Sequence, residues 1–177
     1  MAVQPVSGSA VTPTNPASPG RTHMYYTGKA EYVFGDGLSY DAWDVTLDGD
    51  DEDVLALDTV EGSHLNFSVT VANRGRHGGG LTVLAFWRPV GHSAPLRQKL
   101  FAFAGVAGVG AGSEADTALA FTLKTEHLAI ADENGDQVVR GGVYEVFFKA
   151  GSEAAHPLLV RKVAVRGEAR LVQAFEG

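Results

Sequence analysis

Alternating hydrophobic and polar residues mark the clearest strand of the chain, at residues 64–72. Its apolar positions are Leu65, Phe67, Val69 and Val71. A period of two places these side chains on one face, which predicts a half-buried strand. Residues 81–88 (LTVLAFWR) are apolar on both faces and precede Pro89, which predicts a central strand that ends in a loop. Because the intervening NRGRHGGG is typical of a turn, we expect the two strands to be antiparallel neighbours.

Further short strands are predicted at residues 42–47, 54–57, 97–103, 117–123, 138–139, 143–149 and 158–166. The glycine-rich residues 105–116 predict a turn, and DENGD predicts another, with Gly135 at positive φ. Residues 125–131 have short helical character. About seven to nine short strands without a long helix are typical of a sandwich or barrel.

The segment Gly142-Val143-Tyr144 bears on the choice between a sandwich and a barrel. It fits the tyrosine corner of immunoglobulin-like sandwiches, in which a tyrosine near the start of a late strand donates its hydroxyl to upstream backbone. A tyrosine in an ordinary strand fits these residues equally well. We predict an all-β fold, an immunoglobulin-like antiparallel β-sandwich with an extended N-terminal segment.

Composition divides the chain into four segments. With 45% hydrophobic and 20% charged residues, the chain as a whole has ordinary globular composition. Residues 1–20 are rich in Pro, Ser, Thr and Ala and are predicted to be a disordered or linker tail. Residues 21–41, which we call the strap, combine aromatic residues with turn-forming glycines. The sandwich is expected over residues 42–170 and a C-terminal tail over residues 171–177.

Charge and cysteine content exclude several classes of function. The 14 basic and 21 acidic residues give a net charge of −7, which repels phosphate backbones, so nucleic acid is not expected as a partner. No apolar run is long enough to span a bilayer, so no membrane partner is expected. Without cysteine there is no disulfide, thiolate zinc site or thiol nucleophile. The first twenty residues lack the basic and apolar regions of a secretory signal.

Candidate metal and cofactor sites are weak. The acidic residues 48–53 and 132–136 lack the glycine and glutamate positions of an EF-hand, so solvated turns are favoured over calcium sites. The six histidines show no i, i+4 pair of the kind that binds zinc. The sequence GVAGVGAG lacks the Lys-Ser/Thr that follows a phosphate loop, which favours a hairpin. We therefore predict no catalytic, cofactor-binding or metal-binding residue.

Two tryptophans, Trp43 and Trp87, are candidate contacts for a sugar or a protein partner. Aromatic faces stack well on the apolar faces of pyranose rings. Packing in the core or at an interface is the alternative, and it is favoured over a sugar platform.

The strap carries a family resemblance. Its segment Phe34-Gly35-Asp36-Gly37-Leu38-Ser39-Tyr40 resembles the F-G-x-G-L-S-Y motif at which family 3 glycoside hydrolases enter their C-terminal fibronectin type III-like sandwich. PGRT at residues 19–22 and YTG at residues 26–28 resemble the β-xylosidase version of that junction. The resemblance extends to about residue 166, through FSVTVANRG at residues 67–75 and EHLAIADENGDQVVRGG at residues 126–142.

The resemblance implies a supporting role. Family 3 enzymes are similar to one another in placing nucleophile and general acid on preceding domains, for which this chain has no room, so the chain alone is not expected to be an enzyme. The implied function is a non-catalytic accessory domain of a β-xylosidase or β-glucosidase, with the catalytic domains in cis or on a separate chain. The resemblance also implies an extracellular location. The alternative is a free-standing β-sandwich module that binds polysaccharide or protein.

The strap holds more aromatic residues than a linker needs, so we expect it to pack against the catalytic domains. Its candidate interface residues are Arg21, Tyr25, Tyr26, Tyr32, Phe34, Gly35, Gly37, Leu38 and Tyr40.

Overall fold

The computed structural model describes residues 20–49, 54–91, 96–112, 116–151 and 156–175. In these residues the chain forms eleven strands, one short α-helix, α1 (Thr22–Tyr25), and one 3-10 helix, η2 (Thr125–Leu128). The strands are β1 (Trp43–Leu47), β2 (Leu55–Asp58), β3 (His64–Asn73), β4 (Gly79–Val90), β5 (Lys99–Val109), β6 (Thr117–Lys124), β7 (Ile130–Ala131), β8 (Gln137–Val139), β9 (Gly142–Ala150), β10 (Leu159–Arg166) and β11 (Arg170–Gln173). Neither described helix has the length and apolar character needed to cross a membrane.

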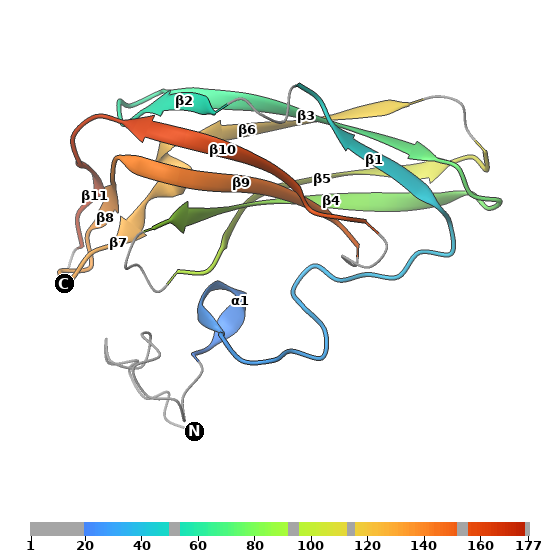
Figure 1. Cartoon of the computed structure of the whole chain (residues 1–177), viewed down its shortest axis with the longest axis horizontal. Helices are drawn as coiled ribbons and strands as arrows, with labels where there is room; N and C mark the ends of the chain where they lie inside the picture. Colours follow the sequence, from blue (N-terminus) through green and yellow to red (C-terminus); the bar gives the residue numbers. More distant parts are fainter. Residues whose placement is uncertain (1–19, 50–53, 92–95, 113–115, 152–155, 176–177) are drawn as a thin grey trace.

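The strands form a sandwich, as predicted (Figure 1). A three-stranded sheet, in the order β1-β3-β6, faces a five-stranded sheet, in the order β2-β10-β9-β4-β5. A small third sheet, β11-β8-β7, lies at one end of the sandwich (Figure 1). The pairings are antiparallel except for the parallel pair of β2 and β10.

The predicted pairing of the strands at residues 64–72 and 81–88 is wrong. These segments lie in β3 and β4, but β3 pairs with β1 and β6, whereas β4 pairs with β5 and β9. The turn between them therefore crosses from one sheet to the other. Asn73 and Asp41 hold this crossover, because Asn73 donates to the carbonyl of His77 at 2.9 Å and the Asp41 carboxylate accepts from the backbone N–H of His77 at 2.8 Å.

The core lies between the two large sheets and follows the alternation of the sequence. Leu119, Phe121 and Leu123 of β6 are all buried, as their spacing predicts. From the opposite sheet, Phe148 of β9 packs on Phe121 with ring centroids 5.2 Å apart. Near the start of β10, the buried Arg161 donates to the carbonyls of residues 47, 48 and 49, which ties β10 to the end of β1 in the other sheet.

Two strands are longer than expected. β4 continues through Pro89. This proline lies beyond the last pair between β4 and β5, which joins Trp87 and Lys99, so its missing N–H interrupts no β4–β5 hydrogen bond. β5 includes Gly105 to Val109 of the expected glycine-rich turn. A β-carbon at Gly105 would lie 2.8 Å from the Leu81 carbonyl oxygen, so glycine here permits close approach of the backbones.

The structure describes the predicted C-terminal tail but not most of the predicted N-terminal tail. Residues 1–19 of the predicted tail lie outside the described residues, so that prediction stays untested. The predicted C-terminal tail, residues 171–177, begins inside β11, where Leu171 pairs with Val138. Arg170 fixes this strand by an ion pair with Glu126 at 2.9 Å, a contact between distant residues that local composition does not reveal.

The tyrosine corner is present. The Tyr144 hydroxyl donates to the carbonyl of Arg140 at 2.7 Å, and the side chain is only 2% exposed. Burial raises the pKa of this phenol above its ordinary value. The neutral hydroxyl therefore stays a donor at neutral pH.

Replacing Tyr144 by phenylalanine is expected to lower the free energy of unfolding by about 1–2 kcal/mol, because it leaves the part-buried Arg140 carbonyl without this donor. Urea unfolding followed by circular dichroism measures the difference. Tyr40→Phe is the matched control, since that side chain is 100% exposed, and it should change little. Equal stabilities of the two variants would contradict a stabilising tyrosine corner.

Candidate functional site

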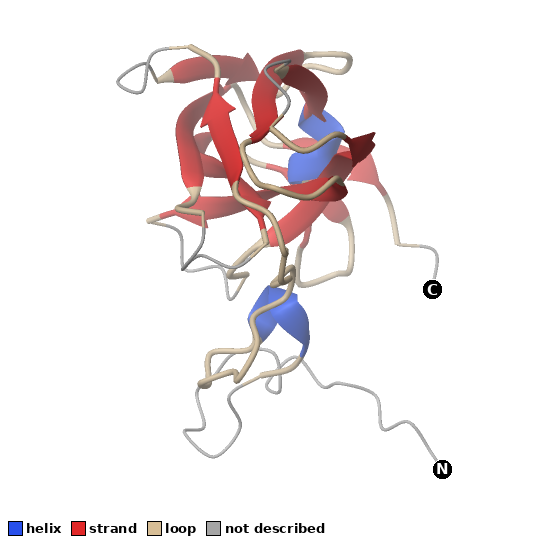
Figure 2. Ribbon diagram, turned by 90° about the vertical axis from the view of Figure 1, so that its right-hand side faces the viewer, coloured by secondary structure: helices blue, strands red, loops and turns tan. Residues whose placement is uncertain are grey.

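The strap lies on the outer face of the five-stranded sheet, outside the two main layers (Figures 1 and 2). Two rings on that face, Phe86 of β4 and Phe147 of β9, stack with centroids 5.2 Å apart. They are 0% and 3% exposed. The strap contacts Phe86, and the Arg88 guanidinium lies 5.3 Å from the centroid of the Phe147 ring. Within the strap, His23 stacks on Phe34 at 4.1 Å, and Phe34 meets Phe86 edge-on at 6.0 Å. This contact explains why LTVLAFWR is apolar on both faces.

An ion pair fixes the middle of the strap to the sheet. The Lys149 side chain on β9 is only 3% exposed, and its Nζ lies 2.6 Å from Asp36 Oδ1. The same Nζ donates to the Phe34 carbonyl at 3.2 Å, while Asp36 Oδ2 accepts from the Val33 N–H at 2.9 Å. The hydrogen bond from Lys149, followed by that from Val33, lowers the pKa of Asp36 below its ordinary value.

Glycine at position 35 permits this attachment. Gly35 has φ +85°, and an added β-carbon would lie 2.6 Å from Leu84 Cδ1. The positive φ disfavours any larger residue here, and a β-carbon would also require the Leu84 side chain of β4 to shift. The glycine of the junction motif is thus explained by the contact between strap and sheet.

The start of the strap is tied to the segment that leads into β5. The Arg97 N–H donates to the Met24 carbonyl at 2.8 Å, and Arg97 Nη1 donates to the Tyr26 carbonyl at 2.7 Å. Met24 and Tyr25 pack against the sandwich core. The strap is therefore attached at both its start and its middle.

The predicted interface residues divide into attached and exposed positions. Tyr25, Tyr26 and Gly35 are half-buried against the sandwich, and Phe34 is 45% exposed. The outward-facing group consists of Arg21, Tyr32, Gly37, Leu38 and Tyr40. Leu38 and Tyr40 are 99% and 100% exposed, which leaves two large side chains without cover on an attached segment.

The interpretation of Trp43 and Trp87 as surface contacts is wrong. They are 5% and 0% exposed and belong to the core. Both belong to the core cluster between the sheets, and Trp87 meets Tyr144 edge-on at 5.7 Å. Neither ring presents a face to a ligand, so the alternative of core packing holds. Their indole N–H groups have no hydrogen-bond partner among the described residues.

The acidic segments show no ligand geometry where they are described. Residues 50–53 lie outside the described residues. Asp132 accepts from the backbone N–H groups of Asn134 at 2.9 Å and Asp136 at 3.0 Å, so its carboxylate stabilises the turn. Gly135 has φ +91°, as that turn predicts. In the described part of the chain, no cluster of three or more potential metal ligands occurs.

Two carboxylates line a hollow of about 350 Å³ between the strap and β4, those of Asp36 and Asp41. A pair of carboxyls is the equipment of a glycosidase, so their contacts matter. Asp36 is paired with Lys149, and Asp41 accepts from the His77 N–H at 2.8 Å and from Asn73 Nδ2 at 3.3 Å. These bonds hold the strap and the crossover turn, which assigns both carboxylates to structure.

The sequence patterns did not reveal three residues that hold the strap: Lys149, Arg97 and Phe86. One signal for them existed, because both LTVLAFWR and VYEVFFK are apolar on two faces. A strand in a two-layer sandwich needs only one apolar face, so a second one indicates additional cover. The arrangement defines the class of this chain: an all-β sandwich with an external strap that exposes apolar side chains.

Comparisons with known proteins extend this description. No family model matches the chain. The exo-1,4-β-xylosidase xlnD of Emericella nidulans is 29% identical over 142 residues, which are 73% of this chain and 17% of that protein. The xlnD enzyme of Aspergillus oryzae is 31% identical over 149 residues, 75% of this chain and 18% of that protein. The chain thus spans less than a fifth of these curated relatives.

Solved structures agree in fold. A GH3 exo-β-xylosidase (XlnD) in complex with a xylobiose aziridine probe has a TM-score of 0.74 and 26% identity, over 94% of this chain and 23% of its own. A β-glucosidase from Listeria innocua has a TM-score of 0.64 and 22% identity, over 89% of this chain and 21% of its own. The chain is therefore a homologue of one part of the family 3 glycoside hydrolases, with an extent consistent with their C-terminal domain.

Proposed function

We propose that this chain is a non-catalytic, fibronectin type III-like accessory domain that supports the catalytic domains of a family 3 β-xylosidase or β-glucosidase. The catalytic domains would lie in cis or on a separate chain. The observation on which this proposal rests is the pair of fully exposed side chains, Leu38 and Tyr40, on a strap that is otherwise attached to the sandwich. Exposed apolar side chains on an ordered segment mark an interaction surface.

The attachment of the strap favours docking over flexible linkage. Lys149 holds the middle of the strap and Arg97 holds its start. Leu38 and Tyr40 therefore lie only a few residues along the chain from the position that Lys149 fixes. A preorganised segment loses less conformational entropy on binding than a free linker does. The length comparison supports the same partner, because the relatives have most of their chain beyond the matching part.

The non-catalytic role is supported by the contacts of Asp36 and Asp41, the two carboxylates that line the hollow between the strap and β4. A retaining glycosidase needs two carboxyls about 5 Å apart across the sugar. Asp36 and Asp41 instead serve as hydrogen-bond acceptors for the fold. We expect the purified chain to leave nitrophenyl β-xyloside and nitrophenyl β-glucoside unhydrolysed, and measurable turnover would contradict the proposal.

A chimera tests the docking surface. The part of the Aspergillus oryzae xylosidase that matches this chain is replaced by this chain, with and without the double substitution Leu38→Ser and Tyr40→Ser. We expect the double variant to lower the thermal midpoint and the soluble yield of the chimera. The isolated chain should keep its stability, because both side chains are exposed there.

Leu171→Ser is the matched control, since Leu171 is an exposed leucine on β11, away from the strap. It should leave the chimera unchanged. If the double variant and the control have the same thermal midpoint in the chimera, the strap does not dock and the proposal is wrong.

A further inference from the structure

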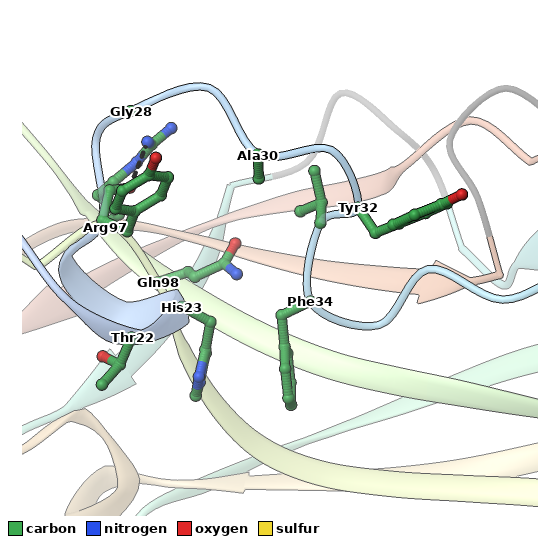
Figure 3. Close-up of a pocket in the computed structure, with 10 residues that line it drawn as sticks. Thr22, His23, Gly28, Ala30, Tyr32, Phe34, Arg97 and Gln98 are labelled. Atoms are coloured by element: carbon green, nitrogen blue, oxygen red, sulfur yellow. Dashed lines mark hydrogen bonds between the residues drawn. The ribbon is translucent and has the colours of Figure 1, made fainter. Parts of the chain in front are cut away.

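The strap and the segment that leads into β5 form the walls of a half-open pocket (Figure 3). Its volume is about 480 Å³, within the range of small-molecule sites. In Figure 3 the strap arches over the Gln98 side chain, with His23 and Phe34 on one side and Arg97 on the other. The docking residues Leu38 and Tyr40 do not line this pocket.

Aromatic rings form much of the pocket wall. His23 and Phe34 stack at 4.1 Å, and Phe86 of the sheet supports Phe34 from behind at 6.0 Å. The Tyr26 hydroxyl donates to the Lys29 carbonyl at 3.3 Å, and Tyr32 stands at the rim, 84% exposed. Planar rings held in this way suit the apolar C–H faces of a sugar ring.

The polar side chains that line the pocket include Gln98 and Arg97. Figure 3 shows the Gln98 carboxamide pointing between the rings, and it forms no hydrogen bond with any described residue. Arg97 is held by its backbone N–H on Met24 and by Nη1 on Tyr26. Within the described ranges, no carboxylate forms an ion pair with Arg97.

The charged groups that line the pocket indicate the sign of the charge that a ligand should carry. Burial lowers the pKa of His23, so its ring is neutral at pH 7 and Arg97 is the cation of the lining. An oriented guanidinium that no described carboxylate pairs with favours an anionic ligand at this place on the surface. If the ligand were a single carboxylate side chain of another protein, it would leave most of the pocket volume and the aromatic rings uncontacted. A sugar that carries a carboxylate would pair with Arg97 and also fill the volume beside the rings.

We propose that this pocket binds a uronic acid, a pyranose that carries a carboxylate. Its carboxylate would pair with Arg97, its hydroxyls would bond the Gln98 carboxamide, and one ring face would pack against the aromatic wall. This site is separate from the docking surface, so the inference goes beyond the accessory role and does not depend on it.

Titration of the full chain with D-glucuronate, followed by NMR chemical shifts, tests the site. D-glucose is the neutral sugar control, and acetate is the carboxylate without a sugar. We expect saturable binding of glucuronate and at least about tenfold weaker binding of glucose and of acetate, because each lacks one of the two recognised parts.

Substitutions locate the binding. Arg97→Met should weaken glucuronate binding by about tenfold to a hundredfold, the value of a charge-assisted hydrogen bond. Because Arg97 also holds the strap, Gln98→Leu provides a second variant that removes only an unused polar group. Arg76→Met, in the exposed turn between β3 and β4, is the matched control and should leave the affinity unchanged.

Three results would overturn the inference: no saturable binding of glucuronate, equal binding of glucose or acetate, or affinities that Arg97→Met and Gln98→Leu leave unchanged. None of these results bears on the chimera, which tests docking through Leu38 and Tyr40. The two proposals can therefore fail separately.

Discussion

Replacing Trp87 by alanine is expected to lower the free energy of unfolding by about 3–5 kcal/mol. The indole is 0% exposed in the middle of the core and contacts Tyr144 edge-on at 5.7 Å. Trp87 lies on β4, which has neighbouring strands on both sides, so the surrounding side chains can collapse only partly into the space that alanine leaves.

Denaturant unfolding followed by circular dichroism measures this loss. Phe103→Ala, on the neighbouring strand β5, removes an aromatic ring that is 71% exposed and should change the stability by less than about 0.5 kcal/mol. Trp87→Phe should cost less than alanine, because phenylalanine fills much of the space and the indole N–H has no partner to lose among the described residues. A loss below about 1 kcal/mol for the alanine variant would contradict the core position of Trp87.

Alternation predicted the strands well because it records burial directly. In β3 and β6, one face meets the core and the other meets solvent, so a period of two appears in the sequence. The same pattern states only which face is buried, not which strand lies alongside. The short connection between β3 and β4 suggested a hairpin, but it crosses between the sheets. Pairing partners therefore needed the structure.

The strap shows a second limit of sequence patterns. Its aromatic residues predicted contact with a surface, and the structure shows that one part of it covers Phe86 on the sandwich itself. The attachment through Lys149 joins residues 113 positions apart, which no local pattern encodes. Trp43 and Trp87 show a related limit. Residue type alone does not distinguish an aromatic side chain in the core from one that stacks on a sugar.

The residue that the strap needs most is Asp36, and Asp36→Ala is expected to destabilise strap attachment by about 3 kcal/mol. Its carboxylate is the partner of Lys149, whose side chain is 3% exposed. Without it, the ammonium stays buried with the Phe34 carbonyl as its remaining acceptor among the described residues, or the strap detaches and uncovers Phe86. Hydrogen exchange of the Val33 and Asp36 amides should then become faster, and proteolysis within residues 21–41 should increase.

Two further variants separate the ion pair from general surface effects. Asp44→Ala removes a carboxylate that is 66% exposed and pairs with Arg74 at 3.0 Å, and it should change the stability by less than about 1 kcal/mol. Adding Lys149→Met to Asp36→Ala should restore much of the attachment, because it removes the unpaired buried charge. If Asp36→Ala leaves amide exchange in the strap unchanged, the ion pair does not hold the strap.

Acidification should have the same effect as Asp36→Ala. The pKa of Asp36 in the folded chain is lower than its ordinary value of 3.8, so the folded state favours the charged carboxylate. The stabilisation is therefore complete above the ordinary value and is lost as the pH falls through the lowered one. Strap exchange should be slow at neutral pH and should increase in this acidic range, whereas the Asp36→Ala variant should lack this step. An acid-induced step that is present in the unmodified chain and missing in Asp36→Ala would thus assign strap attachment to this one carboxylate.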